Sequence, residues 1–296
     1  MTRPDAWVTP ALTAAMLVWG LNFPVVKALT HWFDATQIAA LRMTVACATF
    51  WLLLRWRRLR WPQLNRRQWL GLVACSLLMV VLNQILFAGG MQRTSAVNGA
   101  LITATAPLAG SLLAALAFGE RLHGRHAAAL ALGFGGVAVV VLHQPGAALG
   151  GTGLGDLMVA GSVVSFAAGG VIVQRMSTRL DALQLSTVVY TIGAAGLVLQ
   201  LLLLQGSTLN VQRLFPGWQP WLMVVASGVM ATALANWVWN AAIGRIGVAR
   251  TSMFVYWVPV FGMGFSTLLL REPLNAWYGL GLLMVLAGSR LAARRG

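Results

Sequence analysis

Three polar side chains lie four residues apart in an apolar segment of the last third of the chain. Thr232, Asn236 and Asn240 therefore share one face of a helix, and Trp239 lies beside them. An asparagine amide offers both donors and acceptors, which suits a zwitterionic or amide-bearing solute. The alternative is that these groups bond neighbouring helices and hold a bundle together. We predict that Asn236, Trp239 and Asn240 line a substrate cavity.

Other polar residues inside apolar segments form a second candidate set. A polar group in a bilayer needs a partner or a wet cavity, so such residues indicate the interior of a bundle. Trp19 and Tyr256 could supply apolar walls with a polar tip for an aromatic or aliphatic side chain. The expected substrate-binding residues of this set are Trp19, Asn22, Asn83, Gln84, Asn98, Ser252 and Tyr256.

Three prolines lie within apolar segments, at Pro24, Pro107 and Pro259. Proline has no amide hydrogen, so each leaves the carbonyl four residues earlier without its helical donor. Inside a bundle, the kinks and free carbonyls could serve a binding site or a hinge. The alternative is plain bending to fit neighbouring helices.

Arg42 lies about seven residues, or ~10 Å at 1.5 Å per residue, inside an apolar segment. An arginine at that depth must pair or reach water, and it could attract a substrate carboxylate. The sequence favours a structural role, in which Arg42 bonds backbone carbonyls or an acid at the end of a segment.

Carboxylates and histidines lie at the ends of the apolar segments or between them. No metal cluster or catalytic dyad can therefore assemble at depth, and we expect a protein that is not an enzyme and uses no metal and no cofactor. Proton-coupled transporters commonly keep a carboxylate or histidine at depth, so we hypothesise export without proton coupling. The six acids are Asp5, Asp34, Glu120, Asp156, Asp181 and Glu272.

Membrane-spanning helices must position the candidate residues. The chain of 296 residues is 58% hydrophobic and 9% charged, with a mean hydropathy of +0.76, whereas soluble domains are roughly 45–50% apolar and about 25% charged. Segments of the size that crosses a bilayer recur along nearly the whole chain. We predict an all-α integral membrane protein with ten transmembrane helices, at Ala6–Leu29, Ala35–Leu54, Gln68–Gly90, Ser95–Phe118, Ala127–His143, Asp156–Met176, Ala182–Leu204, Pro220–Ile243, Thr251–Leu270 and Asn275–Leu291.

The positive charge predicts the orientation of these helices. Lysine and arginine number 21 against 6 acids, for a net charge of +15. With both termini in the cytoplasm, most of the arginines lie in cytoplasmic loops, as the positive-inside rule requires. The basic run Arg55–Arg67 then fits a topology anchor whose tryptophans lie at the headgroup level, and we expect the lipid bilayer, not nucleic acid, as its partner.

The two halves of the chain repeat each other at an offset of 152 residues. Pro107 matches Pro259 and Glu120 matches Glu272, and both residue types are scarce here. Five helices per half is an odd number, so the two five-helix repeats, 1–148 and 149–296, must be inverted. Inverted repeats can expose a midplane site alternately to either side, although channels also use them.

The matching residues resemble a known family. Trp19-Gly20-Leu21-Asn22-Phe23, Arg42, Thr94-Ser95-Ala96 and Pro107 with Gly119-Glu120-Arg121-Leu122 look like the first EamA-type repeat of the drug/metabolite transporter superfamily. Pro259 and Glu272-Pro273-Leu274 resemble its second copy. The second half departs from the pattern at Ser165-Phe166-Ala167-Ala168, which has no Trp-Gly-x-Asn. The resemblance therefore does not imply matching roles for Trp19 and Asn22 in the second half.

The resemblance implies ten helices, cytoplasmic termini, a central cavity and efflux of metabolites or drugs. In its general pattern the chain is similar to the YddG-type amino-acid exporters. The expected protein is thus a monomer in the bacterial inner membrane that exports amino acids, aromatic and other neutral ones, by alternating access. The alternatives are export of a drug, a nucleobase or another metabolite, and, from other classes, a membrane-embedded enzyme or a structural subunit.

Overall fold

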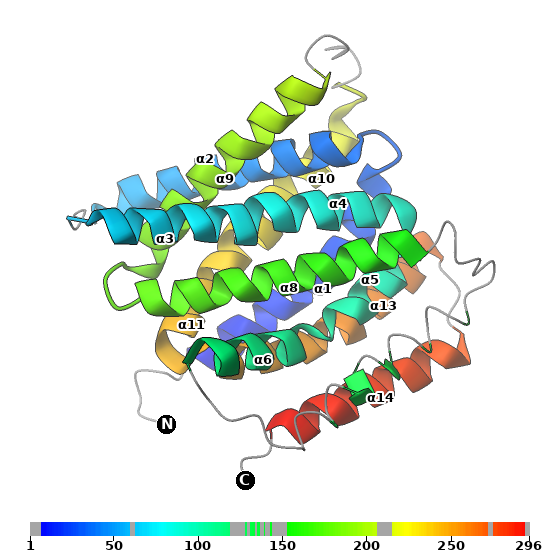
Figure 1. The fold of residues 1–296 in the computed structure, drawn as a ribbon. Coiled ribbons are helices and arrows are strands. Elements are labelled where there is room, and N and C mark those ends of the chain that lie inside the picture. The colour runs from blue at the N-terminus through cyan, green and yellow to red at the C-terminus, as the bar shows by residue number, and fades with distance from the viewer. Residues whose placement is uncertain are drawn as a thin grey trace.

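The computed structural model describes residues 7–59, 63–118, 153–205, 215–271 and 275–293, with isolated positions between 128 and 143. Every regular element in these ranges is helical, and the long helices lie side by side in one bundle (Figure 1). The elements are α1 (Val8–Leu29), α2 (Ala35–Arg57), α3 (Arg66–Ser76), η2 (Leu77–Leu82), α4 (Asn83–Arg93), α5 (Ala96–Thr103), α6 (Ala106–Phe118), α8 (Gly153–Met176), α9 (Ala182–Gln205), α10 (Trp218–Ala226), η4 (Ser227–Leu234), α11 (Ala235–Ile246), α12 (Val248–Ser252), η5 (Met253–Tyr256), α13 (Trp257–Leu270) and α14 (Ala276–Ala293).

Eight helices of the described chain are long and apolar enough to cross a membrane. They match the expected spans one to four and six to nine, because segments such as α3, η2 and α4 join into one continuous span, Arg66–Arg93. The tenth expected span corresponds to the shorter apolar helix α14. The fifth, Ala127–His143, lies mostly outside the described residues. The protein is an all-α membrane protein.

The outer surface of the bundle is apolar. Leucines of α8, α9 and α13 are largely exposed, with Leu157 71%, Leu203 76% and Leu268 77% accessible. Leucine side chains that are exposed to this extent suit contact with the hydrocarbon chains of lipid and not with water. The apolar excess of the sequence therefore faces lipid as well as neighbouring helices.

Two helices begin at matching capping boxes. At α2, the Asp34 carboxylate accepts from the amides of Thr36 and Gln37 at 2.9 and 3.0 Å, and the Gln37 side chain accepts from the Asp34 amide at 3.2 Å. Asn65 and Gln68 do the same at α3. These contacts satisfy amides that have no helical partner, so both helix starts are fixed by local sequence.

The fourth helix of each repeat is interrupted close to its proline. In the first repeat, α5 ends at Thr103 and α6 begins at Ala106, one residue before Pro107. In the second, α12 passes through the 3₁₀ segment η5 before α13, which contains Pro259. The missing proline amide explains both interruptions. Pro24, in contrast, lies inside α1, which is continuous.

The interrupted helices pack crosswise on one another through glycine. A Cβ atom built on Gly110 of α6 would lie 2.7 Å from Ser252 Oγ, and one built on Gly262 of α13 would lie 2.6 Å from the Cβ of Ala100. At the offset of 152, Gly110 is equivalent to Gly262 and Ala100 to Ser252. The same close contact is therefore made twice, as the repeat of the sequence requires.

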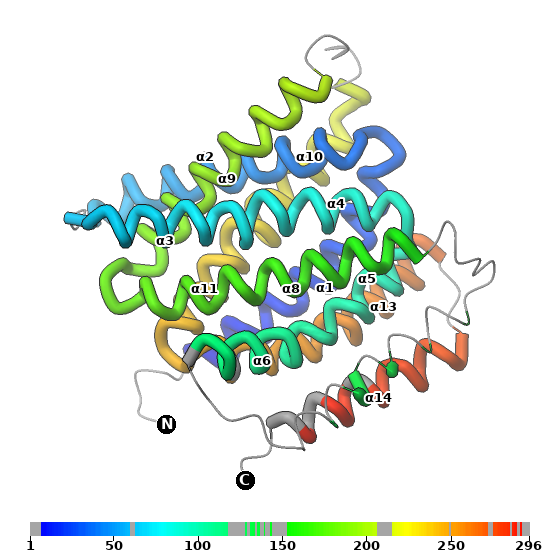
Figure 2. Tube along the Cα trace, in the orientation of Figure 1, coloured from blue at the N-terminus to red at the C-terminus, as the bar shows by residue number. Residues whose placement is uncertain are grey.

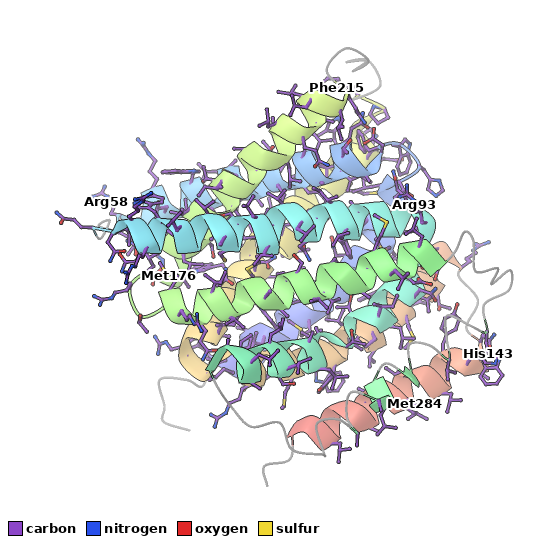
Figure 3. The ribbon with its side chains drawn as sticks, viewed as in Figure 1. Arg58, Arg93, His143, Met176, Phe215 and Met284 are labelled. Atoms are coloured by element: carbon purple, nitrogen blue, oxygen red, sulfur yellow. The ribbon has the colours of Figure 1, made fainter. Side chains whose placement is uncertain are left out.

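Other helix pairs join the two halves of the chain. α2 packs along α9, α1 along α13 and α4 along α8, and Figure 2 shows α14 at the edge of this bundle. The isolated position His143 stacks its ring on Trp277 of α14, with ring centroids 3.8 Å apart. Figure 3 places Arg58 and Met176 at one end of the bundle and Arg93, Phe215 and His143 at the other.

We predict that Gly262→Ala lowers the thermal unfolding midpoint in detergent, because the added methyl group overlaps Ala100. Overpacking of this kind typically costs about 1–3 kcal/mol. Gly264→Ala is the matched control, since a Cβ atom at Gly264 meets nothing within 4 Å and alanine favours helix. Equal midpoints for the two variants would contradict the crosswise contact.

Candidate functional site

A cavity of about 120 Å³ lies where the interrupted helices meet the rest of the bundle. Thr103 and Val255 line it, together with Ala106 and Val258. These residues are two repeat-equivalent pairs at the offset of 152. Pro107 and Pro259 have no amide hydrogen to donate to the carbonyls of Thr103 and Val255, so each break removes one helical hydrogen bond next to the cavity.

Six of the ten residues expected to bind substrate line this one cavity. They come from α1, α4 and α11, which are far apart in the sequence. The six are Trp19, Asn22, Asn83, Gln84, Asn236 and Trp239.

One wall of the cavity is aromatic. The rings of Trp19 and Trp239 have centroids 5.1 Å apart, and Phe166 contacts both, at 5.9 and 5.8 Å. The Trp19 indole donates to the carbonyl of Ala231 at 2.8 Å, which fixes that ring in place. The wall offers flat apolar surface to a solute.

A polar wall is centred on Arg42, which is buried, with only 3% of its surface accessible. Its Nε donates to Ser227 Oγ at 2.7 Å, Nη1 to Gln84 Oε1 at 3.3 Å and Nη2 to Thr232 Oγ1 at 3.1 Å. The expectation that Arg42 bonds backbone carbonyls or an acid is therefore wrong: its hydrogen-bond partners in the described chain are neutral side chains.

These partners are held by further hydrogen bonds. Ser227 Oγ donates to Asn22 Oδ1 at 2.5 Å. Gln84 Nε2 donates to Asn83 Oδ1 at 2.8 Å, and Asn83 Nδ2 donates to the Ser162 carbonyl at 2.9 Å. The polar wall is thus a connected network that spans α1, α2, α4, α8 and η4, and it contains no carboxylate among the described residues.

Two buried groups at the cavity have no hydrogen-bond partner within the described residues. They are the side-chain oxygen of Asn236 and the indole nitrogen of Trp239. The Asn236 amide nitrogen donates to the carbonyls of Ala231 and Thr232, at 3.1 and 2.9 Å, whereas its buried oxygen has no partner in the described chain. Buried polar groups in proteins are nearly always paired, so an acceptor and a donor remain here for a solute.

Comparison with known proteins identifies the scaffold. The model of the EamA-like transporter family matches the chain twice, over residues 7–142 and 153–294. The chain belongs to the EamA-like transporter family. It is therefore a multi-pass membrane transporter rather than an enzyme, and its partners are the lipid bilayer and a small-molecule substrate.

Relatives of this transporter carry transport names. A protein of Escherichia coli (strain K12) named "Probable amino-acid metabolite efflux pump" is 27% identical over 92% of this chain and 90% of its own length. "Uncharacterized transporter YetK" of Bacillus subtilis (strain 168) is 22% identical over 94% and 84%. A solved crystal structure, 20% identical, superposes with a TM-score of 0.69 over 97% of this chain and 96% of that one, and so has the same fold.

Four expected site residues of the transporter lie away from the cavity. Asn98, with Thr94, donates to the Asp156 carboxylate, where α5 and α8 begin. Asn240 donates to Ser186 on α9 at 2.9 Å. Ser252 bonds the carbonyl of Val248 in its own helix, and Tyr256 is also absent from the lining of the cavity.

Sequence reasoning did not identify several residues of the site. A separate offset of 147 aligns Val25, Val26 and Lys27 of the first half with Ile172, Val173 and Gln174 of the second. At this offset Phe166 occupies the position of Trp19, which the repeat could have revealed. Ser227 could not be found from α-helical spacing, because η4 is a π-helical segment. In this segment the Thr232 hydroxyl donates to the carbonyl of Ser227, five residues earlier, so the four-residue spacing does not place Ser227 on the face of Thr232. In the described chain no three His, Cys, Asp or Glu residues are grouped to hold a metal ion.

We predict that Ser227→Ala destabilises the transporter by about 1–3 kcal/mol, because it leaves Arg42 Nε and Asn22 Oδ1 without their partner. Thermal unfolding in detergent measures the effect. Ser76→Ala is the control: Ser76 is equally buried, but its hydroxyl bonds only the carbonyl of Leu72 in its own helix. Equal loss in both variants would argue against a special role for Ser227.

Proposed function

We propose that the protein exports small metabolites, and in particular neutral and aromatic amino acids, from the cytoplasm across the bacterial inner membrane. The observation that carries this proposal is a cavity with one aromatic and one polar wall at the meeting of the two repeats. An amino acid has the same two-sided character. The name of the Escherichia coli relative supports the same substrate class.

Alternating access fits this cavity. The residues at the two interrupted helices, Thr103 and Val255, come from opposite repeats and reach the same space. Rocking of one repeat against the other would open that space first to one side and then to the other. Both repeats of one chain contribute to the lining of the cavity, and we propose that the monomer is the transport unit.

The proposed orientation places both termini in the cytoplasm. Arg58 and Met176, which precede expected cytoplasmic loops, lie at the same end of the bundle (Figure 3). The arginine bias of those loops supports cytoplasm on that side. Export then runs towards the end that carries Arg93.

The test of function is flux from proteoliposomes that contain the purified chain. We expect efflux of preloaded phenylalanine or leucine, and Trp239→Leu should reduce it at least tenfold because the aromatic wall is lost. Trp69→Leu is the matched control, since Trp69 is exposed at the surface of α3. Efflux of a nucleobase or a drug without amino-acid efflux would favour the alternative substrates.

We further predict that this efflux follows the gradient of the substrate alone. Among the described residues, the lining of the cavity contains no carboxylate and no histidine that could carry a proton. Efflux rates measured with and without an imposed pH gradient should agree within a factor of about two. Efflux that requires the gradient would contradict uncoupled export.

A further inference from the structure

The positive charge of Arg42 is positioned by the protein but not neutralised by it. Within the described chain, no carboxylate forms an ion pair with Arg42, and each of its hydrogen-bond partners is neutral. A buried charge is expensive unless it is paired. An anionic group in the cavity would therefore be strongly favoured.

The neighbours of Arg42 are locked so that their oxygens face the guanidinium. The Ser227 hydroxyl donates to Asn22, the Thr232 hydroxyl donates to the Ser227 carbonyl, and the Gln84 amide donates to Asn83. Each partner therefore accepts from Arg42 and cannot itself serve as a donor to a substrate anion with the same hydrogen. Among the described residues that line this wall, Arg42 is the cation that can attract an anion.

Arg42 keeps the donors that such recognition needs. A guanidinium carries five N–H donors, and its bonds to protein use one on each of its three nitrogen atoms. One N–H remains on each terminal nitrogen. A carboxylate pairs with arginine most strongly through two parallel N–H bonds, which is the number that remains.

An acceptor for the opposite charge lies one helical turn away. Thr232 accepts from Arg42 through its hydroxyl and from the Asn236 amide through its carbonyl, so both residues converge on it. The side-chain oxygen of Asn236 has no partner within the described residues, and Asn236 is only 6% accessible. Arg42 and Asn236 are therefore held close together by their bonds of 3.1 and 2.9 Å to the same residue, as the adjacent charged groups of an α-amino acid require.

We infer that Arg42 and Asn236 form a recognition site for the α-amino-acid zwitterion, with the carboxylate on the guanidinium and the ammonium group on the amide oxygen. The side chain of the substrate then lies against Trp19, Phe166 and Trp239. This inference rests on the proposed function and adds to it the groups that a substrate must carry. Solutes without ionised groups and simple amines lack the carboxylate and are poor ligands.

The experiment compares three related compounds on the purified full chain at about pH 6, where α-amino groups are protonated. Phenylalanine has both charged groups, phenylalaninamide lacks the carboxylate, and 3-phenylpropionate lacks the ammonium group. Apparent affinities come from the ligand-induced rise of the thermal unfolding midpoint. In the wild-type chain, we expect phenylalanine to bind at least tenfold more tightly than either analogue.

Two variants assign each preference to its residue. Arg42→Gln should abolish the preference for phenylalanine over phenylalaninamide, and Asn236→Ala should abolish the preference over 3-phenylpropionate. Arg42→Lys, which keeps the charge but not the planar fork, should show an intermediate preference. Arg93→Gln is the charge-matched control, because Arg93 lies outside the cavity and donates to the Gly89 carbonyl of its own helix. Its binding profile should match that of the wild type.

Several outcomes would overturn the inference. These are equal binding of phenylalanine and phenylalaninamide by the wild-type chain, no binding of any of the three compounds, or an unchanged preference in a folded Arg42→Gln variant. The wild-type comparison decides the question even if the variants fail to fold. Proteoliposome flux separates the two proposals, because selective binding without flux would refute export alone, and unselective flux would refute the zwitterion site alone.

Discussion

The guanidinium of Arg42 links the two halves of the molecule, because a charge inside a bilayer must be surrounded by polar groups. The oxygens that accept from it belong to Gln84 on α4 and to Ser227 and Thr232 on η4. Asn22 on α1 in turn accepts a hydrogen bond from Ser227. Helices from both repeats must therefore lie at fixed depths and rotations relative to α2. These neutral oxygens hold the charge beside the cavity without neutralising it.

The repeated scaffold and the unrepeated site have different origins in the sequence. Each repeat has one proline break and one of the crosswise glycine contacts, so the scaffold around the cavity is symmetric. The polar chemistry does not repeat. At the offset of 147, Trp19 becomes Phe166, which keeps the aromatic wall, but Asn22 becomes Gly169 and Arg42 becomes Val189. A pseudo-symmetric bundle thereby presents an asymmetric solute with two different walls.

Asn236 and Asn240 show where reasoning from spacing reaches its limit. Both lie on one face of α11, and helical periodicity cannot distinguish them. One turn along the helix, however, the neighbour changes from the cavity to α9, where Ser186 accepts from Asn240. Asn98 is likewise directed away from the cavity, because its amide donates to Asp156 at the start of α8. The face of a helix on which a residue lies follows from its local sequence spacing. Its depth in the bundle and the side chain it meets there depend on the packing of other helices.

Hydropathy, repetition and the missing proline amide can all be read along the chain, so the sequence predicts the spans that the structure describes, the inverted repeat and the prolines near the breaks in the fourth helix of each half. It also selected six of the residues that line the cavity. The three-dimensional structure was needed to show that Arg42 has neutral partners, that Ser227 reaches it from a π-helical segment, and that the Asn236 oxygen has no partner among the described residues. Those facts depend on which side chains from distant helices meet, and packing of the whole bundle sets that.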